Sequence, residues 1–295
     1  MQSSSKGEIS QDWQEHEKCP EGIAPVRRST SSITRKHPSL LRSHFNSSLF
    51  VGPEGIHEYA FVRSYVDGRF FGASAMLSIW KPKVNHDEFS LAQLWISSGF
   101  GADLNTIEVG WTVFPKRYGD NEPRFFTFWT RDNYNTTGCY DSDCPGFVQV
   151  DFSVKLGQVI SPISIVGGQT SGITIMVYKG ENGHWWLDVN GVDIGYFPKN
   201  LFTALSEYAD RVDFGGEILN SEKDGHHTTT QMGNGLYPHQ QGASFISGIR
   251  IYDQNKQPVE GILHPVDSTV PYYGVILVNN DTMFYGGPGY SQFYN

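Results

Sequence analysis

Two glutamates in this sequence each stand two positions from a glycine, within runs typical of β-strands. In "NTIEVGW" the alternation of an extended strand places Glu108 and Gly110 on one face and the apolar side chains on the other. In "RVDFGGEILNS" it places Gly215 and Glu217 on one face. Because glycine has no side chain, we expect a gap beside each carboxylate through which a substrate backbone could approach. Two surface glutamates near unrelated glycines would give the same pattern.

Two carboxyl groups held close together can carry out acid–base chemistry. They cannot both ionise cheaply, so one keeps its proton and acts as an acid while the other acts as a base. Such a pair can activate a water molecule for hydrolysis without a metal ion, a serine or a cysteine. Paired carboxylates on a β-sandwich also serve glycoside hydrolysis, so the carboxylates alone do not define the substrate.

Three further side chains are candidates for contact with a substrate. Gln93 in "SLAQLW" and Gln231 in "TTTQMG" carry amides that could donate to the oxyanion of a tetrahedral intermediate, although a hydrogen bond within the sheet is the simpler explanation for each. Trp185 and Trp186 point to opposite faces of an expected strand, so only one can enter the core. The other, taken as Trp186, either stacks on a substrate ring or covers the outer sheet.

A metal site is the alternative function for the pair His226 and His227. Adjacent residues on an extended chain point to opposite faces, and no third ligand follows at a suitable spacing. The sequence also contains no glycine-rich phosphate loop opening a helix. We therefore expect no metal ion and no cofactor.

The composition and patterning predict an all-β fold that would position these residues. Aromatic residues make up 14% of the 295 residues, charged residues only 18%, and there are 32 glycines, which suits a β-rich protein with many tight turns. From about Glu58 onward, short alternating runs recur with turn signals between them. Runs of this length and spacing predict an antiparallel sandwich or barrel.

Local signals predict two hairpins and one short helix. One hairpin turns at residues 180–183, and the next turns at Asn190 and Gly191, a pair that accepts the positive φ of a type I′ turn. Pro198 suits the first turn of a helix in "PKNLFTALSEYAD", where apolar residues recur at helical spacing.

Charge and hydropathy exclude two classes of partner. The formal net charge is -9 and no basic stripe is present, so we expect no nucleic-acid binding. No apolar run is long enough to cross a bilayer, so we expect no membrane partner. The opening "MQSSSKGEIS" lacks the charged start and apolar stretch of a secretory signal.

Other features are typical of an exported protein. Cys139 and Cys144 in "CYDSDC" are separated by a polar loop that a disulfide could close in an oxidising compartment, which leaves Cys19 as the odd cysteine. Glycosylation sequons occur at three asparagines, which are Asn46, Asn135 and Asn280. Residues 1–45 lack regular periodicity and predict a mobile tail, so we assign the β-strand domain to residues 46–295.

A set of segments, taken in order, resembles the plant neprosin family of glutamic peptidases, which cut beside proline. The segments are "NTIEVGW", "YGDNEPRFFTFWT", "TTGCYDSDCPGFVQV", "ISPIS", "HWWLDVNGVDIGYFPKNLF", "VDFGGEILNS", "HHTTTQMGNG" and "YGGPG". They span nearly all of the chain from about Tyr59 to Tyr290. Upstream, "CPEGIAPVRR" resembles the end of the family's activation segment.

The resemblance implies an antiparallel β-sandwich of two sheets over residues 46–295, with a cleft on one concave sheet and a catalytic pair at Glu108 and Glu217. It implies an acid-acting endopeptidase that cleaves proline-containing peptides or proteins, works as a monomer and is extracellular or vacuolar. Unlike family members, the sequence as given shows no signal peptide, which either truncation or a cytosolic protein would explain. It also has no cysteine pair near the C-terminus, so we expect one family disulfide to be absent. The alternatives are a catalytically inactive member, a glycoside hydrolase and a cell-wall binding module.

Overall fold

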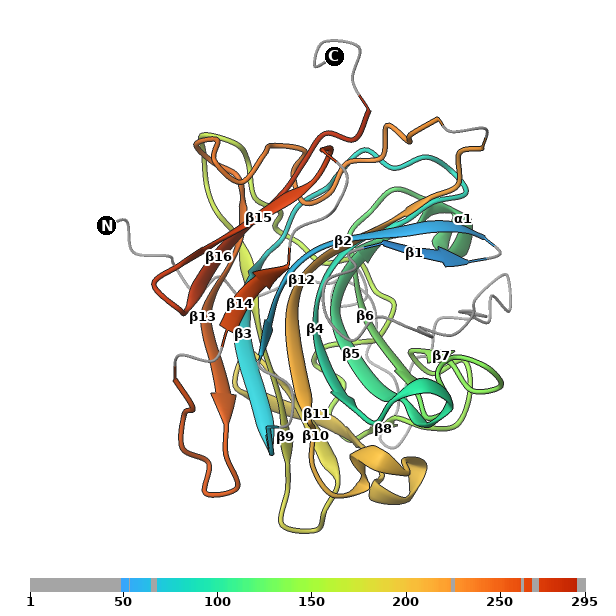
Figure 1. The fold of residues 1–295 in the computed structure, drawn as a ribbon, viewed down its shortest axis with the longest axis vertical. Helices are drawn as coiled ribbons and strands as arrows, with labels where there is room; N and C mark the ends of the chain where they lie inside the picture. Colours follow the sequence, from blue (N-terminus) through green and yellow to red (C-terminus); the bar gives the residue numbers. More distant parts are fainter. Residues whose placement is uncertain are drawn as a thin grey trace.

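A computed structural model describes residues 49–52, 54–64, 68–223, 226–260, 263–266 and 271–290 of the chain. Two antiparallel sheets pack against each other around a shared core, as the ribbon shows (Figure 1). This arrangement confirms the predicted all-β sandwich. Cys19, Asn46 and the tail expected over residues 1–45 lie outside the described residues.

The first sheet carries both glutamates and runs in the order β1-β2-β12-β4-β5-β6-β7, with β14 paired to β2. Its strands are β1 (Leu49–Gly52), β2 (Gly55–Ser64), β4 (Ser90–Ser98), β5 (Asn105–Val113), β6 (Arg124–Thr130), β7 (Cys139–Tyr140), β12 (Arg211–Asn220) and β14 (Leu263–Val266). Strands β12, β4, β5 and β6 bow together in Figure 1. Every residue of β4 and β5 is buried, so both faces of this part of the sheet are covered.

The second sheet runs in the order β15-β16-β13-β3-β9-β10-β11-β8. Its strands are β3 (Gly72–Ser78), β8 (Val148–Gln149), β9 (Gly172–Lys179), β10 (Trp185–Val189), β11 (Val192–Phe197), β13 (Ser244–Tyr252), β15 (Gly274–Val278) and β16 (Thr282–Gly286). Pairing of β9 with β10 and of β10 with β11 confirms both predicted hairpins. Asn190 and Gly191 have φ values of 55° and 89°, as the expected type I′ turn requires.

The helix expected from Pro198 is wrong. The segment instead forms two 3₁₀ turns, η3 (Lys199–Leu201) and η4 (Ala204–Ser206). Asn105 Oδ1 accepts the backbone N–H groups of Thr203 and Leu205 at 2.8 and 3.3 Å, which diverts these donors from helical partners.

The one α-helix among the described residues is α1 (Pro115–Tyr118). Gly119 follows it with a φ of 79° and donates its N–H to the carbonyl of Pro115, which ends the helix after a single turn. A further 3₁₀ turn, η2 (Gly101–Asp103), precedes β5. The α-helix therefore lies in the connection between β5 and β6 and not after Pro198, where we expected it.

The core between the sheets is built from the alternate residues of the facing strands. On the first sheet these include Leu94, Val109 and Phe214, all fully buried. Trp111 crosses to the second sheet and donates Nε1–H to the carbonyl of Ser78 at 2.9 Å. Since these residues face the core, their strand neighbours face the opposite side of the first sheet.

Candidate active site

Glu108 and Glu217 lie on β5 and β12, the two strands that flank β4. Gln93 of β4 is directly opposite Gly110 on one side and Gly215 on the other. Glu108 precedes Gly110 by two residues and lies opposite Trp95. Glu217 follows Gly215 by two residues and lies opposite Leu91. The register therefore places the two carboxylates on either side of Gln93, on one face of the sheet.

This face is the one turned away from the core between the sheets. Glu108, Gln93 and Glu217 are nevertheless buried, with 0%, 0% and 1% of their surface exposed. Aromatic side chains cover the same face and form two groups. One group contains Phe61, Trp95 and Val266 with Tyr59 packed against it, and the other contains Phe89, Leu91, Leu104, Phe114, Tyr118, Phe126, Phe128, Tyr134, Tyr140 and Leu219. The carboxylates are therefore held in a largely apolar setting, which strengthens their hydrogen bonds.

The two oxygens of Glu217 have different nitrogen partners. Oε1 lies 2.6 Å from Nδ1 of His57, a buried residue of the neighbouring strand β2. Oε2 accepts a hydrogen bond from Nε2 of Gln93 at 3.1 Å. With the proton on Nδ1 of His57, both oxygens receive an N–H, an arrangement that suits a charged carboxylate.

Two hydroxyl groups meet at one oxygen of Glu108. Oε1 accepts hydrogen bonds from Thr106 Oγ1 at 3.0 Å and from the Tyr134 hydroxyl at 2.7 Å. Thr106 is the preceding same-face residue of β5, whereas Tyr134 comes from the loop between β6 and β7. The two glutamates therefore differ in their hydrogen-bond donors. N–H groups meet the oxygens of Glu217, and O–H groups donate to Glu108.

The glycines beside the glutamates have a role that the sequence interpretation missed. A Cβ added at Gly110 would lie 1.9 Å from the carbonyl oxygen of Ala92 on the adjacent strand. At Gly215 it would lie 2.3 Å from the carbonyl oxygen of Ala60. Both glycines are therefore required by close approach of neighbouring strands. This explains them without the substrate gap that we expected, and their contact with a substrate stays a prediction.

The other candidate substrate residues have contacts with residues other than the two glutamates. Gln231 accepts a hydrogen bond from the backbone N–H of Lys83 at 3.0 Å, in the connection between β12 and β13. Trp185 is fully buried in the core, as one of the tryptophan pair must be. Trp186 lies on β10 of the second sheet, half-buried beside Tyr196, and so is not in the same site as the glutamates.

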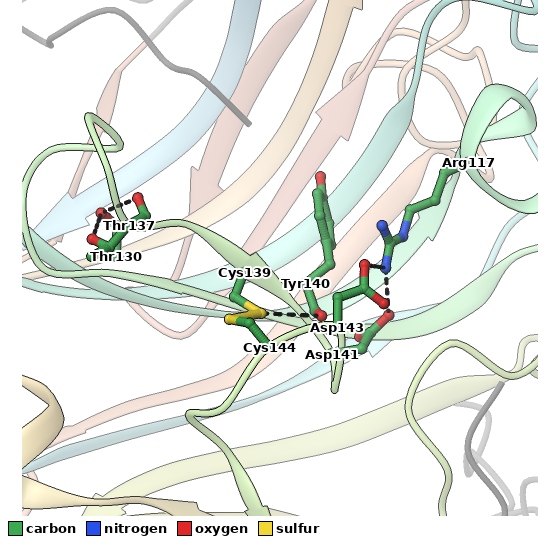
Figure 2. Close-up of a disulfide and its surroundings, with 8 residues drawn as sticks. All are labelled: Arg117, Thr130, Thr137, Cys139, Tyr140, Asp141, Asp143 and Cys144. Atoms are coloured by element: carbon green, nitrogen blue, oxygen red, sulfur yellow. Dashed lines mark hydrogen bonds and ion pairs between the residues drawn. A yellow bond between two sulfur atoms is a disulfide. The ribbon is translucent and has the colours of Figure 1, made fainter. Parts of the chain in front are cut away.

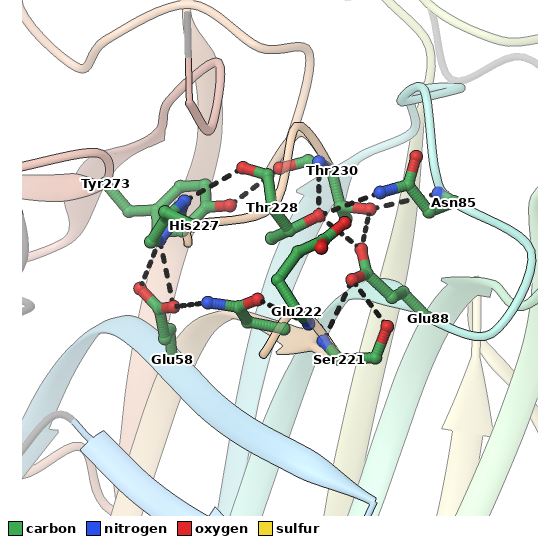
Figure 3. Close-up of polar contacts among 10 residues, drawn as sticks. Glu58, Asn85, Glu88, Ser221, Glu222, His227, Thr228, Thr230 and Tyr273 are labelled. Atoms are coloured by element: carbon green, nitrogen blue, oxygen red, sulfur yellow. Dashed lines mark hydrogen bonds and ion pairs between the residues drawn. The ribbon is translucent and has the colours of Figure 1, made fainter. Parts of the chain in front are cut away.

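Two more buried glutamates hold the connection between β12 and β13 (Figure 3). Glu58 binds His227 Nε2 at 3.0 Å and Asn220 Nδ2 at 3.1 Å. Glu88 accepts hydrogen bonds from several hydroxyl and N–H groups, those of Ser221, Thr228 and Thr230. Burial together with the charges of Glu58 and Glu88 raises the pKa of Tyr273 well above its ordinary value.

These contacts give His227 a structural partner. Its neighbour His226 is exposed. Within the described ranges, no three His, Cys, Asp or Glu side chains are gathered as a metal ion would need.

Cys139 and Cys144 form a disulfide, as predicted (Figure 2). Beside it, Arg117 contacts the carboxylates of Asp141 and Asp143 at 3.5 and 2.7 Å. Burial, only partly offset by the charge of Arg117, raises the pKa of Asp141 to about 6. The disulfide thus closes a short loop next to a buried ionisable cluster.

His57 and Tyr134 are the site residues that the sequence interpretation missed. In "GIHEYAF" the alternation places His57 on one face with Tyr59 and Phe61, but nothing local indicates that β2 pairs with β12. Tyr134 lies in the turn-rich "RDNYNTTG", where hydrophobic periodicity gives no signal. Both depend on contacts between distant parts of the chain.

Fold and site together define an antiparallel β-sandwich with a pair of buried glutamates on the outer face of one sheet. A family model described as Neprosin matches residues 86–288, which is more than half of the chain and includes both glutamates. The chain therefore belongs to the Neprosin family, which confirms the resemblance in its sequence.

Comparison with solved structures finds matches at low identity. Scytalido-glutamic peptidase with a peptide-based transition state analog matches at a TM-score of 0.43 and 8% identity, covering 80% of this chain and 98% of that chain. SCP-B, an Eqolisin-family peptidase with the tripeptide Ala-Ile-His, matches at 0.40 and 9%, covering 80% and 98%. An alginate lyase from Pseudomonas aeruginosa matches at 0.29 and 12%, covering 61% and 85%.

In the described part of the chain, no helix has the length and hydropathy of a membrane span.

Proposed function

We propose that this chain is a glutamic endopeptidase that acts in acid and cleaves peptide bonds beside proline. Membership of the Neprosin family supports a peptidase. The observation that carries the mechanism is the placement of Glu108 and Glu217 on either side of Gln93, on one face of the sheet. A carboxylic acid side chain keeps its proton mainly in acidic solution, so a pair that needs one proton favours acid.

We assign Glu217 as the general base. The N–H groups of His57 and Gln93 meet its two oxygens, which suits the charged form that accepts a proton. Glu217 takes a proton from water as the water oxygen adds to the peptide carbonyl carbon. The nitrogen of Gln93 donates one N–H to Glu217 and has a second N–H that can stabilise the resulting oxyanion.

We assign Glu108 as the general acid. Its Oε1 already accepts two hydroxyl groups, so a proton on Glu108 is carried by Oε2. That proton passes to the amide nitrogen as the carbon–nitrogen bond breaks, which releases an amine and leaves Glu108 charged. The proton held by Glu217 then returns to Glu108 through solvent, and the pair is restored.

The oxygen of the Gln93 amide is a second polar group between the two glutamates. Among the described residues, Gln93 Oε1 is a buried acceptor with no hydrogen-bond partner. Buried acceptors without a partner are rare in folded proteins because they cost free energy. A peptide N–H or a water lying between the two glutamates would satisfy it.

Aromatic side chains beside Glu108 support the choice of proline. Trp95 is directly opposite Glu108 in the sheet, and its ring lies 6.1 Å from that of Phe61 and 6.2 Å from that of Tyr59. A proline ring is compact and apolar, and it packs well on an aromatic face. Incubation with a proline-rich peptide in acid, with the cuts mapped by mass spectrometry, should show cleavage beside proline. Cuts unrelated to proline would contradict the specificity, and release of reducing sugar from a glycan in place of peptide cleavage would contradict the peptidase.

We also propose an extracellular or vacuolar location, a monomeric state and glycosylation. The disulfide supports an oxidising compartment. The sequon residues Asn135 and Asn280 are exposed, so a glycan could be attached without disturbing the core. Protein made through a secretory pathway should lose mass on deglycosylation and elute as a monomer. An unchanged mass would contradict the glycosylation.

Residues 1–45 are proposed as the end of an activation segment, because "CPEGIAPVRR" resembles that part of the family. Incubation in acid should trim them and leave a stable sandwich beginning before Glu58. Loss of the folded sandwich on trimming would contradict this assignment.

A further inference from the structure

The loop between β6 and β7 has a backbone conformation that presents one side chain to Glu108. Asn133 and Tyr134 have φ values of 55° and 60°. Two successive residues with positive φ are uncommon, and a bulky aromatic side chain there is strained. Strain of this kind persists where the surroundings impose it, often beside a functional group.

Hydrogen bonds within the loop impose this conformation. The N–H of Asn133 donates to the carbonyl of Leu104 at 3.0 Å, and that of Tyr134 donates to Oγ1 of Thr130 at 2.9 Å. The Thr130 hydroxyl in turn donates to the carbonyl of Thr137 at 3.0 Å, and Figure 2 shows this threonine pair beside the disulfide. The loop is therefore tied to Thr130 at the end of β6 and to Leu104, which precedes β5.

Asp132 organises the far side of the same loop. Its carboxylate accepts hydrogen bonds from the backbone N–H groups and hydroxyls of Thr136 and Thr137. Burial opposes ionisation, but the hydrogen bonds from both threonines outweigh it and lower the pKa of Asp132 to about 2. The carboxylate therefore stays charged in mild acid and keeps the loop closed.

The side chain of Tyr134 is held as firmly as its backbone. It is 94% buried, with 6% of its surface exposed, and its ring stacks on Phe128 at 5.8 Å and 28°. Its hydroxyl reaches Glu108 Oε1 at 2.7 Å. A flexible loop would not keep a phenol at this distance from a buried carboxylate.

We infer that Tyr134 is a positioning residue for Glu108. The loop 130–137 holds Tyr134 in place, and its hydroxyl stabilises the charge that Glu108 acquires on giving up its proton. This inference rests on the proposed function. A hydroxyl donates a stronger hydrogen bond to a carboxylate than to a neutral acid, so the contact strengthens as the proton leaves. Fixing Oε1 also limits the positions that Oε2 can take.

Tyr134→Phe keeps the ring on Phe128 and removes only the hydroxyl. We expect kcat on a proline peptide to fall by about 10- to 100-fold, as for loss of a hydrogen bond to a charged group, with KM nearly unchanged. Because the charged form of Glu108 loses a donor, the alkaline limb of the pH–rate profile should move to higher pH. A merely structural loss would lower the rate equally at every pH. Tyr178→Phe, which removes a phenol bound to Asp193 on the second sheet, is the matched control and should behave as wild type.

Two further variants separate the possible outcomes. Asp132→Asn should lower kcat in the wild type but add little in the Tyr134→Phe background, because both act through the same contact. Thr106→Val removes the other hydroxyl on Oε1 and carries the same test should Tyr134→Phe not fold. Wild-type kcat with an unmoved pH profile in Tyr134→Phe, while Glu108→Gln is inactive, would overturn the inference and leave the proposed function standing. A wild-type chain that cuts no proline peptide would overturn both.

Discussion

Glu217 and His57 lie on paired strands and are joined by a contact of 2.6 Å between Oε1 and Nδ1. His57 is directly opposite Leu219, which places its side chain diagonally across from Glu217 on the same face. The ring also lies 5.6 Å from that of Phe89, which fixes its orientation. The imidazole therefore sets the position of the proposed base.

His57→Phe should lower kcat and leave the sandwich folded. The substitution keeps an aromatic ring against Phe89 but removes the N–H that meets Glu217 Oε1. We expect a fall of about 10- to 100-fold, the range for loss of a hydrogen bond to a charged group. Steady-state kinetics on a proline peptide would measure it, with the melting temperature as a check on folding. A wild-type kcat would show that His57 does not position Glu217.

Asp141 should make the protein less stable as the pH rises from mild acid to neutrality. Burial raises the pKa of Asp141 to about 6 in the folded state, against an unfolded value of 3.8. Because the folded value is the higher one, the stabilisation is complete below the unfolded value and is lost as the pH rises through about 6. Relative to Asp141→Asn, the wild type should lose on the order of 3 kcal/mol of unfolding free energy across this window. Urea unfolding of both proteins at several pH values would measure the difference, and parallel curves would contradict it.

Trp95 and Trp186 should differ in their effect on substrate binding. Trp95 lies opposite Glu108 on the first sheet, whereas Trp186 lies on the second sheet. We expect Trp95→Leu to raise KM for proline peptides and Trp186→Leu to leave kcat and KM unchanged, because only the first removes an aromatic face beside the glutamates. Equal effects of the two substitutions would contradict this placement.

Removing the disulfide should destabilise the domain modestly. Cys139 and Cys144 are five positions apart, so the bond closes a very short loop. The chain-entropy relation gives about 2 kcal/mol for a loop of this size. Denaturant unfolding of the double variant with serine at both positions would measure the loss, and an unchanged free energy would mean that the bond contributes nothing to stability.

Alternation along single strands was enough to predict an all-β fold and the faces of the two glutamate strands. Val109 and Trp111 enter the core while Glu108 faces the other side, as the pattern of "NTIEVGW" requires. The turn at Asn190 and Gly191 was equally predictable, because only a few residue types accept its backbone conformation. These features depend on neighbouring residues alone.

Features that depend on distant contacts were not predictable in this way. The contact of His57 with Glu217 joins residues 160 positions apart, and a single sequence does not indicate which strands pair. Tertiary contacts also overrode the helical spacing after Pro198, because Asn105 accepts two N–H groups that a helix would use. The close approach of neighbouring strands explains Gly110 and Gly215, and a role for them in substrate binding stays a prediction.

The central claim is that Glu108 and Glu217 together carry out peptide hydrolysis. Glu108→Gln and Glu217→Gln each keep the side-chain volume and remove the group that exchanges a proton. Cleavage of a proline peptide should be measured for the wild type and both variants across pH ~3–7, a window around the reference pKa of glutamic acid, with melting curves at each pH. The account predicts that each variant loses cleavage at every pH while its melting temperature stays near that of the wild type, which itself should be most active in mild acid. Near wild-type cleavage by either variant, or a wild-type optimum above neutrality, would contradict it.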